Sequence, residues 1–100
     1  MIPNLIIPTE IQQKLKEKHN VNPTEVHEAF MNKEGPYLED TRENHLTDPP
    51  TEWFVAQTDR GRLLKVIFVF KDGNIFLKSA YDANEPTLHT YEIRSKQNRK

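Results

Sequence analysis

Two lysines interrupt the apolar segments on either side of Asp72-Gly73. Asp-Gly between segments of alternating apolar side chains predicts a β-hairpin with a two-residue type I′ turn. Counting back from that turn places Lys65 and Lys78 on diagonal positions of adjacent strands, about 7–8 Å apart. Two ammonium groups at that distance repel each other and are not easily buried, so an anion facing them would favour the arrangement. The alternative is that the lysine stems cover Ile67 and Val69 while the ammonium groups reach water.

The same register divides the hairpin into two faces, because side chains alternate along a strand. The expected pairs are Lys71–Asn74, Phe70–Ile75, Val69–Phe76, Phe68–Leu77, Ile67–Lys78, Val66–Ser79 and Lys65–Ala80. The face expected to carry the helices holds Leu64, Val66, Phe68, Phe70, Ile75, Leu77, Ser79 and Tyr81. The opposite face holds Lys65, Ile67, Val69, Phe76, Lys78 and Ala80.

Histidines and arginines outside the strands add candidates for acid–base and anion chemistry. His45 lies in a polar segment beside Arg42, and an imidazole titrates near neutral pH, so His45 is the preferred acid or base. His89 is the second choice, because it is expected at the same end of the sheet as Tyr81. The histidines show no His-Glu-x-x-His or other paired spacing, so we expect neither a metal nor a cofactor.

Start signals predict two short helices before the hairpin. Thr9 as N-cap, with Gln12 completing a capping box, starts a helix that ends near residues 18–20. Asn22 as N-cap and Pro23 at the first helical position start the next helix. Its apolar face is formed by Val26, Ala29 and Phe30.

The rest of the chain predicts short strands and a last helix. Residues 37–41 are expected to form an edge strand, 42–50 a loop and 51–58 a further strand that reverses at Asp59-Arg60-Gly61. A three-residue reversal places Trp53 on the face of the lysines, and a four-residue reversal does not. Asn84 reads as the N-cap of a last helix, although residues 89–93 also alternate as in a strand.

Composition limits the class of protein. The 14 basic and 15 acidic residues give a net charge of −1, which counts against a dedicated nucleic-acid binder. The charge is uneven, however, because the last seven residues hold four cations and no acid. We expect one domain over residues 1–93 and a disordered basic tail over 94–100. Without cysteine, signal peptide or an apolar stretch of about 20 residues, the chain is expected to be cytoplasmic.

The order of elements and three short motifs resemble the BrnT-like toxins of bacterial toxin–antitoxin pairs, which belong to the RelE-like fold. The motifs are Lys18-His19-Asn20-Val21, Lys78-Ser79-Ala80-Tyr81 and Tyr91-Glu92, within residues 8–92. The implied fold is α+β, with two N-terminal helices packed on one face of a three- to four-stranded antiparallel sheet and a short C-terminal helix. This chain departs from the family at Tyr81, where related toxins carry an arginine.

The segment 34–68 also resembles small uncharacterised bacterial proteins that carry the label ADP-ribosyl-dinitrogen-reductase hydrolase. Hydrolases of that type are much longer and hold two metal ions with clusters of aspartates, which this chain does not supply. A small hydrolase acting at the loop from Arg42 to His45 is therefore the least favoured alternative.

The BrnT-like resemblance implies a metal-independent endoribonuclease that pairs with an antitoxin-like protein and acts on RNA, free or on the ribosome. Such enzymes hold the RNA backbone on a basic sheet face and stabilise the charge of the transition state. Lys65 and Lys78 fit that electrostatic role, and Arg60 and Arg62 would extend the RNA-binding surface. The further implied catalytic residues are Arg42, His45, Tyr81 and His89. The alternative is a non-catalytic interaction module on the same fold that binds an acidic protein or nucleic acid.

Overall fold

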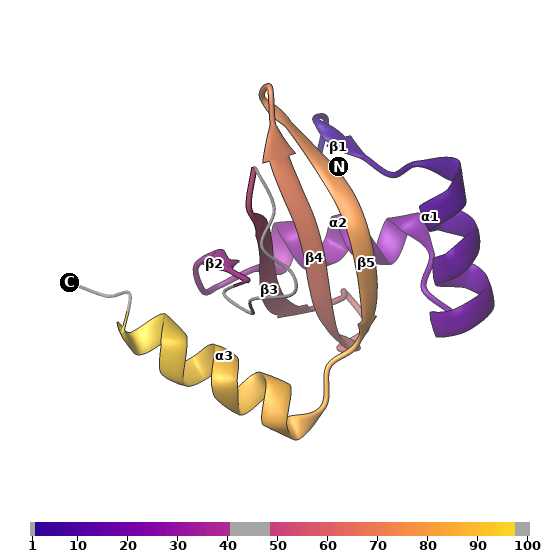
Figure 1. Ribbon diagram of the computed structural model, residues 1–100. Helices are drawn as coiled ribbons and strands as arrows, with labels where there is room; N and C mark the ends of the chain where they lie inside the picture. The colour runs from indigo at the N-terminus through magenta and orange to yellow at the C-terminus, as the bar shows by residue number, and fades with distance from the viewer. Residues whose placement is uncertain (1, 41–48, 98–100) are drawn as a thin grey trace.

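The computed structural model describes residues 2–40 and 49–97, which form an α+β fold (Figure 1). A five-stranded mixed sheet stands at its centre, with α2 on one face and α3 at the other side. No helix in these residues is long and apolar enough to cross a membrane. The elements in chain order are β1 (Leu5–Ile6), α1 (Thr9–Lys14), the π-helical turn η1 (Leu15–His19), α2 (Pro23–Asn32), β2 (Leu38–Glu39), β3 (Thr51–Gln57), β4 (Leu63–Lys71), β5 (Asn74–Asp82) and α3 (Glu85–Gln97).

The sheet has the strand order β1-β5-β4-β3-β2, and β1 runs parallel to β5. The expectation of three or four antiparallel strands was therefore wrong, because it missed β1. This strand has two residues and lies between Pro3 and Pro8, too short for any alternation to show. Asn4 fixes it to the hairpin, since its carbonyl accepts the Ile75 N–H at 2.9 Å and its side chain donates to the Gly73 carbonyl at 2.9 Å.

The Asp72-Gly73 turn has the predicted type I′ conformation, with φ of 53° and 79° at its two residues. The register is as predicted from Lys71–Asn74 to Phe68–Leu77. A β-bulge then makes Lys78 an extra residue on β5, so the next pair is Ile67–Ser79 and not Ile67–Lys78.

The bulge changes which side chains of β5 face the helices. The predicted pairs Val66–Ser79 and Lys65–Ala80 were wrong, because the observed pairs are Val66–Ala80 and Lys65–Tyr81. Ala80 is fully buried with Val66, whereas Tyr81 lies on the same face as Lys65. The extra residue thus places a small apolar side chain under the helices, where the unbulged register would have placed the hydroxyl of Ser79.

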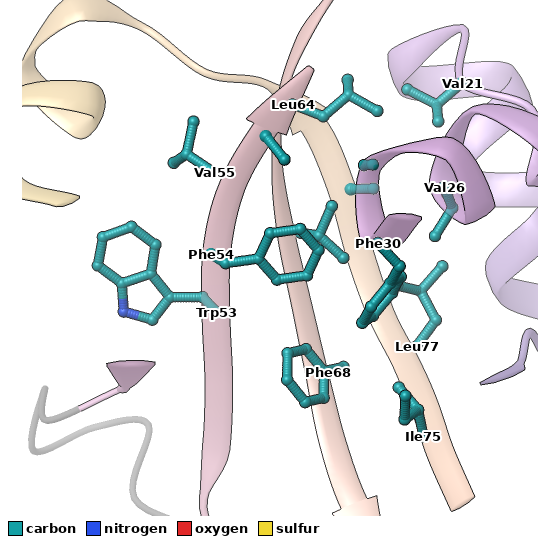
Figure 2. Packing of buried hydrophobic residues seen from close by; sticks show 14 of the residues in the cluster. Val21, Val26, Phe30, Trp53, Phe54, Val55, Leu64, Phe68, Ile75 and Leu77 are labelled. Atoms are coloured by element: carbon teal, nitrogen blue, oxygen red, sulfur yellow. The ribbon is translucent and has the colours of Figure 1, made fainter. Parts of the chain in front are cut away.

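The main core lies between α2 and the sheet. Phe30 of α2 packs edge-on against Phe54 and Phe68, with ring centroids 4.8 and 5.5 Å apart. Figure 2 shows Phe54 and Phe68 on the Phe30 side of the sheet, and Trp53 and Val55 on the opposite side of β3. The predicted apolar face of α2 is confirmed, because Val26, Ala29 and Phe30 are all buried.

The two predicted helix starts had different outcomes. Asn22 and Glu25 form a capping box, each side chain accepting from the backbone N–H of the other residue. Thr9, by contrast, is not a cap: Pro8 is the N-cap of α1 and its first turn has no side-chain cap. The Gln12 side chain instead donates to the Ile7 carbonyl at 3.0 Å. The following turn η1 ends at Asn20, whose left-handed φ of 52° reverses the chain.

Helix α3 is thirteen residues long rather than short, and it continues four residues past Ile93 into the segment expected to be a tail. The Asn84 side chain accepts the Thr87 N–H at 2.8 Å, as predicted for its N-cap. Only Tyr91 among its residues is buried. The Tyr91 ring lies 5.6 Å from that of Trp53, and its hydroxyl donates to the Pro36 carbonyl at 2.7 Å. Because Trp53 faces away from α2, α3 covers part of the second face of the sheet.

Candidate functional site

The reversal between β3 and β4 decides which face Trp53 shares. The Thr58 N–H donates to the Arg62 carbonyl at 2.8 Å, and Gly61 has a φ of 84°, as in a three-residue hairpin loop. This register pairs Val55 with Lys65, so Trp53 lies two residues from the partner of Lys65. Of the two alternatives left open by the sequence, the structure has the one that places Trp53 with Lys65.

Lys65 and Arg94 both approach the indole of Trp53. The Lys65 Nζ lies 4.6 Å from the ring centroid, and the Arg94 Cζ lies 5.8 Å from it. Trp53 itself is only 6% exposed, so it acts as a buried support and offers no open surface for stacking a base. Arg94 is further held by a 3.0 Å hydrogen bond from its guanidinium to the Glu39 carbonyl. Two cations from separate elements are therefore positioned by one aromatic ring.

These two cations line a small polar pocket of about 320 Å³ between α3 and the sheet. Its other described lining residues are Asp40, Trp53, Asn84, Pro86, Thr87 and Thr90. Two cations and one carboxylate leave a net charge of +1, and the threonine hydroxyls can donate hydrogen bonds. The volume is at the lower end for small-molecule sites, so the lining suits a small anionic group such as a phosphate or a carboxylate.

Arg62, a second predicted RNA-binding residue, is engaged elsewhere. Its guanidinium donates to both oxygens of Asp82 at 2.7 and 3.1 Å and to Glu25 at 3.2 Å. It also donates to the backbone carbonyls of His19 and Asn20 at 2.9 and 2.7 Å. The five N–H donors of a guanidinium are all used by these contacts, so Arg62 clamps η1, α2 and β5 together. The hydrogen bonds from Arg62 also hold the pKa of Asp82 below its ordinary value.

The other predicted site residues are dispersed. Lys78 is exposed at the bulge. It lies three residues along β5 from Tyr81, the partner of Lys65, so the Cα atoms of Lys78 and Tyr81 are roughly 10 Å apart. Tyr81 lies opposite Lys65, and its ring contacts that of His19 at a tilt of 44°, with ring centroids 5.4 Å apart. The expected diagonal pair of lysines was wrong, because the bulge increases their separation.

Arg60 and His89 lie away from the Lys65–Arg94 pocket. Arg60 is exposed and lines a different hollow, between the first two helices and the β3–β4 loop. His89 is exposed on α3 and is not among the described residues that line the pocket. Arg42 and His45 lie outside the described residues.

Two carboxylates oppose each other across β2 and β3. Glu39 pairs directly with Glu52. Burial and the charge of Glu39 raise the pKa of Glu52. Glu52 alternates with Trp53 along β3 and therefore projects to the opposite face from Lys65. These acids are thus not placed to act on a ligand in the Lys65–Arg94 pocket.

Arg94 was missed as a site residue because it was assigned to the tail. The available signal was the spacing of Thr87, Thr90 and Arg94, which at i, i+3 and i+7 fall on one helical face. Within residues 2–40 and 49–97, no group of three or more metal-ligating side chains comes together.

Comparison with known proteins leaves the class of protein open. No protein family matches the sequence, and no curated protein is significantly similar to it. The BrnT-like and RelE-like assignments therefore rest on the short motifs alone.

Proposed function

We propose that this protein is a toxin-like domain of the BrnT kind that binds RNA through the Lys65–Arg94 pocket and cleaves it without a metal. One observation carries the proposal: Lys65 and Arg94 come from different elements and converge on the same anion-sized pocket. A phosphodiester bears one negative charge, which matches the net charge of +1 of the described lining. An antitoxin-like partner would complete the pair.

The reaction would be transfer of the phosphoryl group to the neighbouring 2′-oxygen. The 2′-hydroxyl attacks phosphorus and loses its proton to a base, while the bond from phosphorus to the 5′-oxygen breaks. That oxygen takes up a proton, so the products are a 2′,3′-cyclic phosphate and a 5′-hydroxyl. Lys65 and Arg94 would neutralise charge on the non-bridging oxygens, which is the electrostatic part of catalysis. Asp40 is the one carboxylate among the described lining residues, so it is the candidate for the base.

A second candidate function is a binding module that holds RNA or an acidic protein without cleaving it. The described lining of the pocket contains no imidazole, which favours this alternative. Two further histidines have structural contacts. The Nδ1 of His27 accepts the Ile2 N–H at 3.1 Å and burial lowers the pKa of His27, while the ring of His19 contacts that of Tyr81.

Induced expression in a bacterial host tests the proposal. The wild-type chain, a Lys65→Ala/Arg94→Ala variant and a matched Arg60→Ala/Lys71→Ala control would be compared for growth and total RNA. We expect growth arrest and RNA cleavage for the wild type and the control, both relieved in the pocket variant. The purified wild-type chain should cleave RNA in the presence of EDTA and leave cyclic phosphate ends.

The two candidate functions differ in one combination of results. The binding module is supported, and the nuclease contradicted, if the purified chain binds RNA at low salt without cleaving it and the pocket variant no longer binds it. Loss of binding on Lys78→Ala as well would show that the bulge extends the same surface. Equal RNA binding by the pocket variant and the wild type would contradict both the nuclease and an RNA-binding module at this pocket.

A further inference from the structure

The edge of β3 on the β2 side is hydrogen-bonded along its first half and, within the part of the chain that the structure describes, lacks a strand partner along its second half. Asp40 N–H donates to the Thr51 carbonyl on the β2 side, and Thr58 N–H donates to Arg62 on the β4 side. Because hydrogen-bonding direction alternates along a strand, the N–H and C=O groups of Thr51, Trp53, Val55 and Gln57 all point toward the β2 side. Thr51 has a partner there in Asp40, and Trp53 has one in Leu38.

The hydrogen-bond ladder between β2 and β3 stops before Val55, because the residue opposite Val55 in this register would be Pro36. Proline has no N–H to donate to the Val55 carbonyl, and the Pro36 carbonyl accepts the Tyr91 hydroxyl instead. The side-chain amide of Asn32 donates a hydrogen bond to the Gln57 carbonyl at 2.9 Å. The N–H and C=O of Val55 and the N–H of Gln57 therefore have no strand partner among the described residues.

These backbone groups face a groove of about 940 Å³ between β3, α3 and the segment after α2. Its apolar floor is formed by Val55, Ala56, Leu63, Leu88 and Tyr91. Its lining also holds three acids, Glu34, Asp59 and Glu92, and one cation, Lys96, so the net charge of the lining is −2. The volume is within the range of binding clefts.

Helix α3 separates two surfaces of opposite sign. Its side with Thr87, Thr90 and Arg94 faces the cationic Lys65–Arg94 pocket. Its side with Leu88, Tyr91 and Glu92 faces the acidic groove. The groove would repel a nucleic acid that the pocket attracts, so the two surfaces suit different ligands.

We propose that the groove binds an extended, basic segment of a partner protein, which adds a short strand beside Val55–Gln57. Addition to an exposed sheet edge uses main-chain hydrogen bonds for affinity and pockets for alternate side chains for specificity. Here the segment would pair with Val55 and Gln57, place apolar side chains on the floor and direct Lys or Arg side chains to Glu34 and Glu92. The site does not depend on the proposed ribonuclease activity.

Amide hydrogen exchange of the full-length chain, followed by NMR, tests the strand edge in the absence of any ligand. Val55 and Gln57 should exchange rapidly, whereas their neighbours Phe54 and Ala56 should be protected by β4. Equal protection of all four amides would overturn the proposal, because it would mean that the edge is already paired.

The probe for binding is a capped hexapeptide of alternating lysine and valine, with a glutamate–valine hexapeptide of the same length as its counterpart. The basic peptide should shift the resonances of Val55, Gln57 and Leu88 saturably, with a dissociation constant on the order of 1 mM or tighter. It should slow exchange of the Val55 and Gln57 amides at least about tenfold, the protection that a hydrogen bond provides. The acidic peptide should do neither.

A matched pair of variants tests the acidic rim. Glu34→Lys/Glu92→Lys should weaken binding of the basic peptide at least about tenfold, whereas Glu10→Lys/Glu17→Lys changes two exposed acids outside the groove lining and should leave it unchanged. The NMR spectrum itself reports whether each variant is folded. Absence of binding at the millimolar level, shifts centred on Lys65 and Arg94, equal binding of the acidic peptide, or self-association of the chain through this groove would each overturn the proposal.

Discussion

Two cations three residues apart in the sequence have opposite environments. Arg62 uses all its donors on Asp82, Glu25 and two backbone carbonyls, and its side chain is 24% exposed. Lys65 lies on the second face of the sheet, where it and Arg94 approach Trp53 at the rim of a polar pocket. The difference shows that the face of the sheet on which a cation lies, and the elements packed there, decide whether it joins parts of the fold or lines a pocket.

The largest expected effect is on the structural side of this comparison. Arg62→Ala should lower the free energy of unfolding by about 3 kcal/mol, because it leaves two carboxylates and two helix-end carbonyls without their donor. Urea denaturation measures the change. The control Arg60→Ala removes an exposed arginine two residues away and should stay within about 0.5 kcal/mol of the wild type. A loss below about 1 kcal/mol in Arg62→Ala would contradict the clamp.

The next effect concerns the helix that carries Arg94. A Cβ added to Gly35 would lie 2.4 Å from the hydroxyl oxygen of Tyr91, the side chain that anchors α3. Gly35→Ala should therefore cost about 2 kcal/mol and displace α3 from Trp53. Tyr91→Phe alone should cost about 1 kcal/mol, through the lost hydrogen bond to Pro36.

The double variant Gly35→Ala/Tyr91→Phe checks the cause. Removing the hydroxyl oxygen relieves the closest contact, so the double variant should be more stable than the sum of the two single changes predicts. Tryptophan fluorescence should report the displacement of α3, because Trp53 is the only tryptophan of the chain. Strict additivity of the two changes would contradict this explanation.

A smaller stability effect is expected at the pocket. Lys65→Met/Arg94→Met keeps apolar stems over Trp53 and removes two cation–π contacts, which should cost about 1 kcal/mol in total. The same change should reduce RNA binding at least about tenfold at low salt, because it removes the charges that contact phosphate. Thermal unfolding and a filter-binding assay measure the two quantities. A loss of stability as large as that of Arg62→Ala, with RNA binding intact, would reverse the comparison.

The smallest expected effect is the pH dependence of the clamp. Arg62 lowers the pKa of Asp82 in the folded chain, so this contribution to stability is present above the unfolded pKa of about 3.9 and is lost as the pH falls below it. The wild type should therefore lose stability more steeply than Asp82→Asn between about pH 5 and pH 3. Denaturation midpoints across this range measure the slopes. Parallel curves would show that Asp82 contributes nothing to acid sensitivity.

Local signals in the sequence predicted the local structure well. The type I′ turn at Asp72-Gly73 and the N-caps at Asn22 and Asn84 were confirmed, because each depends on interactions within four residues, whereas the capping box expected at Thr9 and Gln12 was wrong. The bulge at Lys78 could not be read in this way. It depends on whether Ser79 or Ala80 fits under η1 and α2, which is a property of the packed core.

The candidate site was predicted only in part. The lysine in the middle of β4 drew attention to Lys65, and that side chain does line a pocket. Its partner Arg94 comes from a helix 29 residues later in the chain, whereas Arg62 donates to Asp82 and Glu25 outside the pocket. The spacing of Thr87, Thr90 and Arg94 shows that these residues share one face of a helix, but no spacing shows that this face packs beside Lys65.

The pairing of β1 with β5 also has a consequence for the order in which the fold can form. Leu5 and Ile6 meet partners about seventy residues later, at Ile75 and Phe76, so their strand remains without a partner on the ribosome until β5 has emerged. The hairpin of β4 and β5 closes over two residues and can form first, as local contacts generally do. The N-terminal strand is then added last, as a seal on a sheet that is already assembled.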